Sequence, residues 1–191
     1  MKPSRSSRPL AAAVAAMMIL VTWPGGTTAP ARAADEGVGV AELDPRTERA
    51  IDRGLAWLAD RQKKDGGWGD KYRCAMTSLS MMSFMLKGYF PERGKYGAVM
   101  EDAVDFLLNE SREHGGYFGV NMYEHGLTTL ALSEVWGMTS SEQVRTALKK
   151  AVDVILRSQS PRGGWRYHPR PTDQDISVTV MQIVALASAR E

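Results

Sequence analysis

Three residues of types that can do chemistry occupy matching places in the sequence: Cys74, His125 and Asp175. Each precedes by four residues a small hydroxyl residue, namely Ser78, Thr129 and Thr179 respectively. Thiolate, imidazole and carboxylate groups are zinc ligands. Neighbouring helices lie about 8–10 Å apart, however, whereas zinc needs every ligand within about 2.3 Å. We therefore expect no metal site and no cofactor, and interpret the set as a polar cavity rim or as ordinary helix-start residues.

Two carboxylates stand together at Asp173 and Asp175, just before an apolar segment. Either residue can cap the helix that follows. Asp175, with Asp173, is also the candidate for a catalytic acid. A helix start favours the charged carboxylate, whereas a proton donor must be neutral. Both interpretations stay open at this stage.

Ligand-binding candidates are chosen from residues expected at one end of the helices. His125 and Cys74 belong to the set above, and Tyr167 lies in a stiff, proline-containing turn, residues 167–171, that we expect to line the mouth of a cavity. A buried cysteine behaves most often as a small apolar residue, so a packing role is the alternative for Cys74.

An internal repeat must position these residues. Gly-Gly-aromatic occurs three times, at spacings of 49 and 48 residues: Gly66-Gly67-Trp68, Gly115-Gly116-Tyr117 and Gly163-Gly164-Trp165. Upstream positions agree without gaps in size and polarity. Such self-similarity is typical of stacked repeats. We expect one repeat domain over residues 45–191, with units 45–95, 96–138 and 139–191.

Each unit is predicted to form two helices. The first has start signals, Asp44-Pro45 in unit one and Ser140-Ser141-Glu142-Gln143 in unit three, and apolar residues at helical spacing. The Gly-Gly pair is expected to end it. The second helices, about 73–87, 123–137 and 174–189, are apolar on most sides, which predicts burial.

The repeat resembles a known motif. Residues 53–58 followed by Gln62 and Gly66-Gly67-Trp68 look like the QW repeat of squalene–hopene and oxidosqualene cyclases. Residues 150–155 followed by Gln159 and Gly163-Gly164-Trp165 resemble it again, whereas Ser111 and Tyr117 replace Gln and Trp in the middle unit. The resemblance implies structural staples between repeats, made by Gln62, Trp68, Gln159 and Trp165.

The same unit resembles that of protein prenyltransferase β subunits and complement-type thioester domains. Residues 122–138 are also similar to bacterial exported prenyltransferase and squalene-oxidase repeat proteins. The resemblance implies an all-α fold, the α/α toroid, here as three helical hairpins forming a partial ring. Residues 173–176 resemble the cyclase acid motif, with Asp175 on the proton donor, but Ile176 replaces an Asp.

Function follows less directly than fold. One hypothesis is an exported enzyme of the cyclase or prenyl-transfer kind. Another is a non-catalytic module that binds an apolar, isoprenoid-like molecule or a peptide in the groove of the inner helices. A third is a shortened relative of a full toroid. Whether the chain is an enzyme stays open, and a homodimer that closes the ring is an expected partner arrangement.

The N-terminal residues predict export. Residues 1–33 combine a basic start, an apolar run from Leu10 to Trp23 and the small residues Ala31-Arg32-Ala33, which is typical of a signal peptide. The run is shorter than a typical membrane span, and an uncleaved membrane anchor is the alternative to a cleaved signal peptide. Residues 34–44 are expected to be a flexible lead-in, and the protein to be periplasmic or extracellular. The 24 basic and 22 acidic residues nearly balance, which gives no indication of nucleic-acid binding.

Overall fold

The computed structural model of the protein describes residues 44–190. The predicted signal peptide and residues 34–43 of the lead-in lie outside the described residues. The described residues divide between two units, residues 44–53 and 54–190. All contacts discussed below belong to the second unit. Within the described part of the chain, no helix has both the length and the apolarity needed to cross a bilayer.

The described residues form six α-helices and no β-strand. These helices are α2 (Pro45–Asp60), α3 (Arg73–Leu86), α4 (Gly97–Glu113), α5 (Met122–Thr139), α6 (Glu142–Arg157) and α7 (Ile176–Ser188). The all-α prediction is confirmed, and the three second helices fall within about two residues of their predicted bounds. Residues 176–186, whose β-branched composition suits a strand, are helical because the helix packs in the repeat register.

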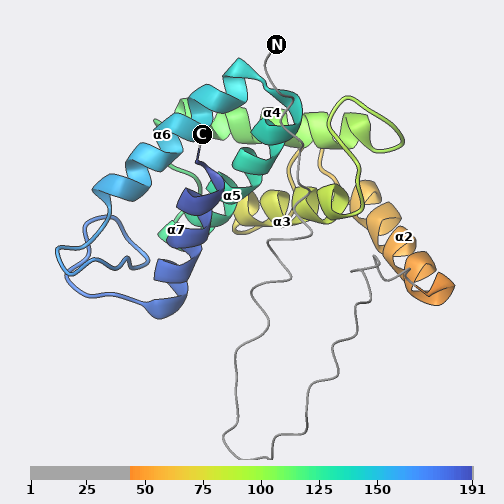
Figure 1. Ribbon diagram of the computed structural model, residues 1–191. Coiled ribbons are helices and arrows are strands. Elements are labelled where there is room, and N and C mark those ends of the chain that lie inside the picture. The colour runs from red at the N-terminus through yellow and green to blue at the C-terminus, as the bar shows by residue number, and fades with distance from the viewer. Residues whose placement is uncertain (1–43, 191) are drawn as a thin grey trace, which may run out of the picture. The chain divides into compact units, whose positions relative to one another are not determined.

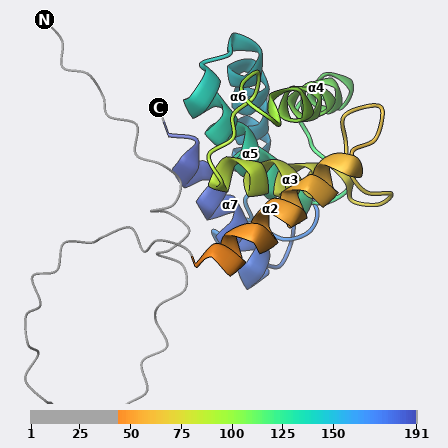
Figure 2. The same ribbon diagram turned by 90° about the vertical axis from the view of Figure 1, so that its right-hand side faces the viewer.

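The second helix of each pair lies in an inner row. Helix α5 packs between α3 and α7, while α3 packs on α4 and α5 packs on α6. Figures 1 and 2 show α4 and α6 together on one side of this row. Inner helices side by side, backed by outer helices, are the arrangement of an α/α toroid, and the three helical pairs follow one another in chain order.

Local signals explain where three of the helices, α2, α5 and α6, begin. Asn121 caps α5 by accepting from the N–H of Glu124, and Ser141 caps α6 by accepting from Val144. Each satisfies one N–H that the first turn leaves unpaired. Helix α2 starts at Pro45, where the lack of an N–H costs nothing.

The expected helix ends are corrected in two units. Helix α4 ends at Glu113, with only His114 between it and Gly115, but α2 ends at Asp60 and α6 at Arg157. In those units the glycines belong to a turn that follows the helix. In this turn Lys63 N donates to Gly67 O at 2.9 Å, and Gly66 N donates back to Lys63 O at 2.9 Å. Residues 160–164 repeat both bonds.

Candidate functional site

The Gln and Trp of the repeat hold this turn against its own outer helix. Nε2 of Gln62 donates to Gly66 O at 2.9 Å, and indole Nε1 of Trp68 donates to Leu58 O at 2.8 Å. Gln159 and Trp165 form the same bonds to Gly163 O, at 2.7 Å, and Ile155 O, at 2.8 Å. Both indoles are buried. Each indole therefore adds a second hydrogen bond to a carbonyl near the end of its helix, beside the bond from Arg61 N or Ser158 N.

Gln62 also reaches the next outer helix, because its Nε2 donates to Val99 O, near the start of α4, at 2.7 Å. Gly66 lies against the same helix: an added Cβ would come within 2.0 Å of Asp102 O. The first turn thus contacts the outer helix of the next repeat, and the staple role of Gln62 and its counterparts stays a prediction.

The middle unit departs from the predicted alignment by one residue. Gly116 there lies against Lys150 of α6, and its φ of 90° matches the φ of 87° at Gly66. Phe118, fully buried, therefore occupies the place of Trp68, and Tyr117 does not. The sequence interpretation was wrong here because α4 runs on to Glu113 and Gly115 is an additional residue beyond its end.

Backbone N–H groups of the three buried aromatic residues define a new register for the inner helices. Trp68 N donates to Thr77 Oγ1 at 3.0 Å, and Trp165 N donates to Thr179 Oγ1 at 3.0 Å. Phe118 N donates to Nδ1 of His125 at 3.1 Å. Thr77, His125 and Thr179 are therefore equivalent, and the proposed equivalence of Cys74, His125 and Asp175 is wrong.

Contacts between inner helices support this register independently. Ser78 Oγ donates to Thr128 Oγ1 at 3.0 Å. Gly126 lies against Gln182, whose Nε2 would be 2.7 Å from an added Cβ. Ser78 and Gly126 each follow a member of the Thr77/His125/Thr179 set by one position, and Thr128 and Gln182 each follow a member by three positions. The same two register positions therefore meet between α3 and α5 and between α5 and α7.

His125 is a buried bridge. Its Nδ1 accepts from Phe118 N, so Nε2 carries the proton and donates to Ala151 O on α6 at 3.1 Å. Burial lowers the pKa of His125 to about 4, so the ring is neutral at physiological pH. Both nitrogens are used in holding α5 to α6 and to the turn, and the predicted ligand-binding role finds no free ring atom.

Asp175 caps α7. Its Oδ1 accepts from Val178 N at 3.0 Å and from Ser177 Oγ at 2.6 Å. These bonds lower the pKa of Asp175, which keeps its carboxylate charged. Asp173 lies on the surface in an ion pair with Arg166 at 3.3 Å. The capping interpretation accounts for Asp175, and its catalytic role stays a prediction that this geometry does not favour.

Tyr167 is exposed on its loop, where its carbonyl accepts from Met122 N, at the start of α5, at 2.8 Å. The backbone of this turn therefore contacts the inner row. A ligand contact by the Tyr167 ring stays a prediction.

Cys74 lines a pocket of about 480 Å³ between α3, the end of α4 and the start of α5, which we call the end pocket. Its other residues are mostly polar or charged: Asp70, Lys71, Tyr72, Arg73, Glu110, His114, Gly119, Val120 and Glu124. The Cys74 thiol donates to Glu110 Oε2 at 3.6 Å. Burial and the nearby carboxylates raise the pKa of Cys74, so the thiol is neutral and a poor nucleophile.

Glu124 is the residue of the end pocket that sequence analysis missed. It is only 3% exposed, and its Oε2 has no hydrogen-bond partner. Burial, and next the charge of Glu110, raise the pKa of Glu124, against hydrogen bonds from the backbone of Cys74 and Val120. Gly119, at φ 69°, makes room for this carboxylate, since an added Cβ would lie 1.7 Å from Oε1.

A sequence signal for Glu124 existed. Asn121-x-x-Glu124 is a helix-start pattern, and Glu124 is one of two charged residues in a largely apolar helix. The pattern by itself indicates a cap, and only packing against Gly119 and Cys74 buries the carboxylate.

One group of described side chains has the spacing of metal ligands: Glu110, Glu113 and His114 at the end of α4 lie within 4.8 Å of one another. Glu113 and His114 are exposed, and Nδ1 of His114 already lies 3.1 Å from Glu110 O. Exposed acidic groups of this kind are common without an ion, so we assign no metal to them.

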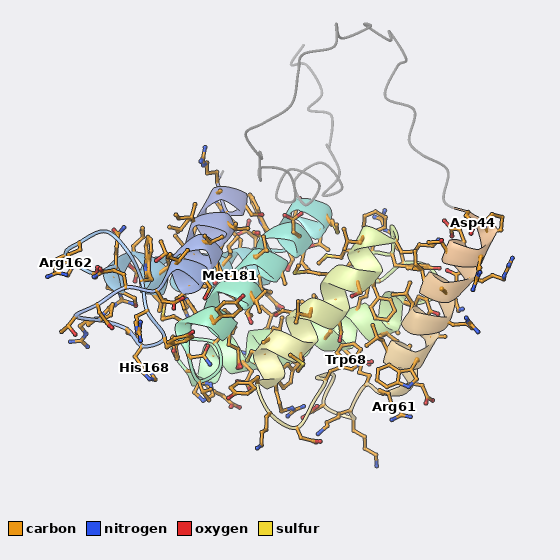
Figure 3. The ribbon with its side chains drawn as sticks, turned by 90° about the horizontal axis from the view of Figure 1, so that it is seen from below. Asp44, Arg61, Trp68, Arg162, His168 and Met181 are labelled. Carbon is orange, nitrogen blue, oxygen red and sulfur yellow. The ribbon has the colours of Figure 1, made fainter. Side chains whose placement is uncertain are left out.

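The inner helices present a second surface, the inner face. On α5, His125 points to α6, Thr128 to α3 and Gly126 to α7. At 100° per residue, the remaining side of α5 carries Tyr123, Leu127 and Leu130. The equivalent positions elsewhere are Ala75, Leu79 and Met82 on α3, and Ser177, Met181 and Val184 on α7. Leu86 of α3 lies on the same side, at the position that Glu134 occupies on α5. Figure 3 looks onto the inner row, with Met181 labelled.

The inner face is apolar and partly open to solvent. Leu79, Leu86 and Tyr123 are exposed, while Met82, Leu130, Met181 and Val184 are half-buried. Glu134, near one end, is held by Ser188 Oγ, which donates to Glu134 Oε1 at 2.7 Å. Exposed apolar side chains grouped on one face mark binding surfaces in soluble proteins.

Comparison with known proteins supports the class of fold. No known family profile and no solved structure matches the chain. Lanosterol synthase of Pneumocystis carinii is 20% identical over 133 residues, which cover 64% of this chain and 18% of that protein. Alpha-2-macroglobulin of Thermotoga maritima is 26% identical over 167 residues, which cover 83% of this chain and 10% of that protein.

The chain thus spans less than a fifth of the length of the curated relatives it matches. These distant similarities, together with the inner and outer rows of helices, indicate a terpene-cyclase-like α/α toroid. A fold of this kind does not by itself define a reaction.

Proposed function

We propose that the protein binds an apolar, isoprenoid-like molecule on the inner face, as an exported, cyclase- or prenyltransferase-like repeat protein. The observation that supports this most directly is the exposure of Leu79, Leu86 and Tyr123 on that face. Similarity to lanosterol synthase, whose name denotes a sterol product, favours the same class of ligand.

Binding would bury these side chains. Burial stabilises by about 25 cal/mol per Å² of apolar surface, so the exposed half of one leucine contributes about 1 kcal/mol. The three exposed side chains together contribute about 3 kcal/mol before the entropic cost of association, and the half-buried side chains of the face add to this.

The test uses farnesol as the probe and isothermal titration calorimetry on the full chain. We expect saturable binding that Leu86→Asn weakens about 5-fold. The matched control is Leu156→Asn, because Leu156 is 56% exposed on outer helix α6 and Leu86 is 52% exposed on α3. An absence of saturable binding, or equal losses in both variants, would contradict the proposal.

Catalysis is a second candidate with a specific observation behind it. An alkene-protonating acid must be neutral, and burial moves Glu124 toward the neutral form whereas Asp175 is held charged. The end pocket is lined mainly by polar and charged groups, however, which suits a polar ligand better than a polyene. We therefore rank binding above catalysis.

A turnover assay with squalene separates the two candidates. Turnover that Glu124→Gln abolishes would support an acid at the end pocket, and turnover lost only in Asp175→Asn would support the acid predicted from the sequence. Peptide binding that competes with farnesol would support the scaffold alternative.

A further inference from the structure

Helix α7 has an exposed apolar stripe on its outward edge, formed by Ile176, Val180, Ile183 and Ala187. The spacing of four, three and four residues places them along one side of the helix. Ile176 is 86% exposed, Val180 37% and Ile183 54%. This stripe is separate from the inner face, which Met181 and Val184 represent on α7.

On the other two inner helices, the residues equivalent to this stripe are covered by a neighbouring helix. The equivalent residues are Cys74, Ser78, Met81 and Met85 on α3, and Met122, Gly126, Thr129 and Ser133 on α5. All eight are buried. They face the next inner helix, as the Ser78–Thr128 bond and the Gly126–Gln182 contact demonstrate. The stripe on α7 is therefore the surface on which a further inner helix would pack.

Helix α3 presents the opposite edge, by which an inner helix packs on the one before it. Residues Val178 and Ala185 of α7 form this edge against α5, and both are fully buried. Their equivalents on α3, Met76 and Ser83, are 38% exposed and half-exposed respectively, while Ser80, the small equivalent of Thr128 and Gln182 between them, is 7% exposed. One chain thus carries both halves of an interface that it already forms twice internally.

We propose that a second copy of this chain covers the stripe, with α7 of each protomer packed against α3 of the other. A twofold axis makes this contact twice and leaves neither edge open. The side chains suit the contact: Ser83 is small, as Ala131 and Ala185 are at the equivalent sites, and lets the helices approach. The inner row then continues from one protomer to the next.

Sedimentation velocity of the full chain tests the association. We expect a dimer, and expect Ile183→Glu to be monomeric because it would bury an unpaired charge. Leu156→Glu, on the similarly exposed surface of α6, is the matched control and should stay dimeric. A monomeric wild type, an open-ended assembly, or a dimer that survives Ile183→Glu would overturn the proposal.

Disulfide trapping tests the arrangement. The Ser78–Thr128 and Gly126–Gln182 contacts predict that Val180 lies opposite Ser80 of the other protomer. The double variant Ser80→Cys, Val180→Cys should form covalent dimers on mild oxidation, and neither single variant should. Dimers formed by Val180→Cys alone would mean that α7 packs on α7 and would overturn the α7–α3 contact.

Failure of this inference and failure of the proposed function are distinguishable. Farnesol titration of the Ile183→Glu monomer reports on the inner face without the interface. Binding retained by a monomeric wild type would overturn only the dimer.

Discussion

The backbone N–H of Phe118 donates to Nδ1 of His125 across 3.1 Å, and both residues are fully buried. Hydroxyl groups of Thr77 and Thr179 accept the same bond from Trp68 and Trp165. The middle unit thus keeps the repeat contact with different residue types. The ring of His125 is also long enough to reach Ala151 O on α6.

His125 makes stability depend on pH. Its pKa is about 4 in the folded chain against 6.5 when unfolded, so the unfolded chain binds the extra proton between these values. The stabilisation is fully present above pH 6.5 and falls, by up to about 3 kcal/mol, as the pH drops toward 4. The measurement is the free energy of unfolding by urea from pH 7.5 to 4.

The control for that prediction is His125→Gln. The variant should be less stable at pH 7 but should lose less stability on acidification, whereas replacing exposed His168 by Gln should change neither. An unchanged slope in His125→Gln would contradict the assignment.

Glu124 makes the stability of the fold depend on pH in the opposite direction from His125. Its raised pKa means that the folded chain binds a proton more tightly than the unfolded chain. Stability from this group is present below about pH 4.5 and is lost as the pH rises through the folded pKa. Glu124→Gln should therefore be more stable than wild type at pH 8, by about 1 kcal/mol, and nearly equal to it at pH 4.5.

Urea unfolding of both proteins at the two pH values checks this prediction. Glu113→Gln, at an exposed carboxylate near the same pocket, is the control and should have no such effect. A Glu124→Gln variant that is less stable at pH 8 would show that the charged form makes a favourable contact.

Gly116 and Gly115 should differ sharply in their tolerance of alanine. At Gly116, φ is 90° and an added Cβ would lie 2.4 Å from Lys150 Cβ, so we expect Gly116→Ala to cost more than about 3 kcal/mol. Gly115, at φ 62°, has open space around it, so Gly115→Ala should cost about 1 kcal/mol. Thermal unfolding of the pair is the measurement, and the reverse order would restore the original alignment.

The indole N–H of Trp165 should contribute to the stability of the fold. Trp165→Phe removes the indole hydrogen bond to Ile155 O, which then keeps only its bond from Ser158 N, and opens a small cavity, so we expect a loss of about 2 kcal/mol. Trp57→Phe is the control, because Trp57 is exposed, and should lie within about 0.5 kcal/mol of wild type. The measurement is the free energy of unfolding of both variants by chemical denaturation. Equal losses of stability in the two variants would contradict a specific role for the indole hydrogen bond.

Sequence alone determined the helices and their order. Apolar spacing, cap residues and the 49- and 48-residue repeat place three inner helices within about two residues of the observed bounds, because these signals act locally. The repeat also predicted the shared roles of Gln62 with Gln159 and of Trp68 with Trp165. Equivalent side chains in turns of the same conformation form the same hydrogen bonds within the turn.

Tertiary structure alone decided the register and the site. One additional glycine shifts Phe118 into the place assigned to Tyr117, and only its bond to His125 reveals the shift. Glu124 has the sequence of a helix cap but becomes a buried carboxylate, because Gly119 and Cys74 close over it. Burial depends on neighbours distant in the sequence, so the pKa values of Glu124 and His125 follow from packing rather than from residue type.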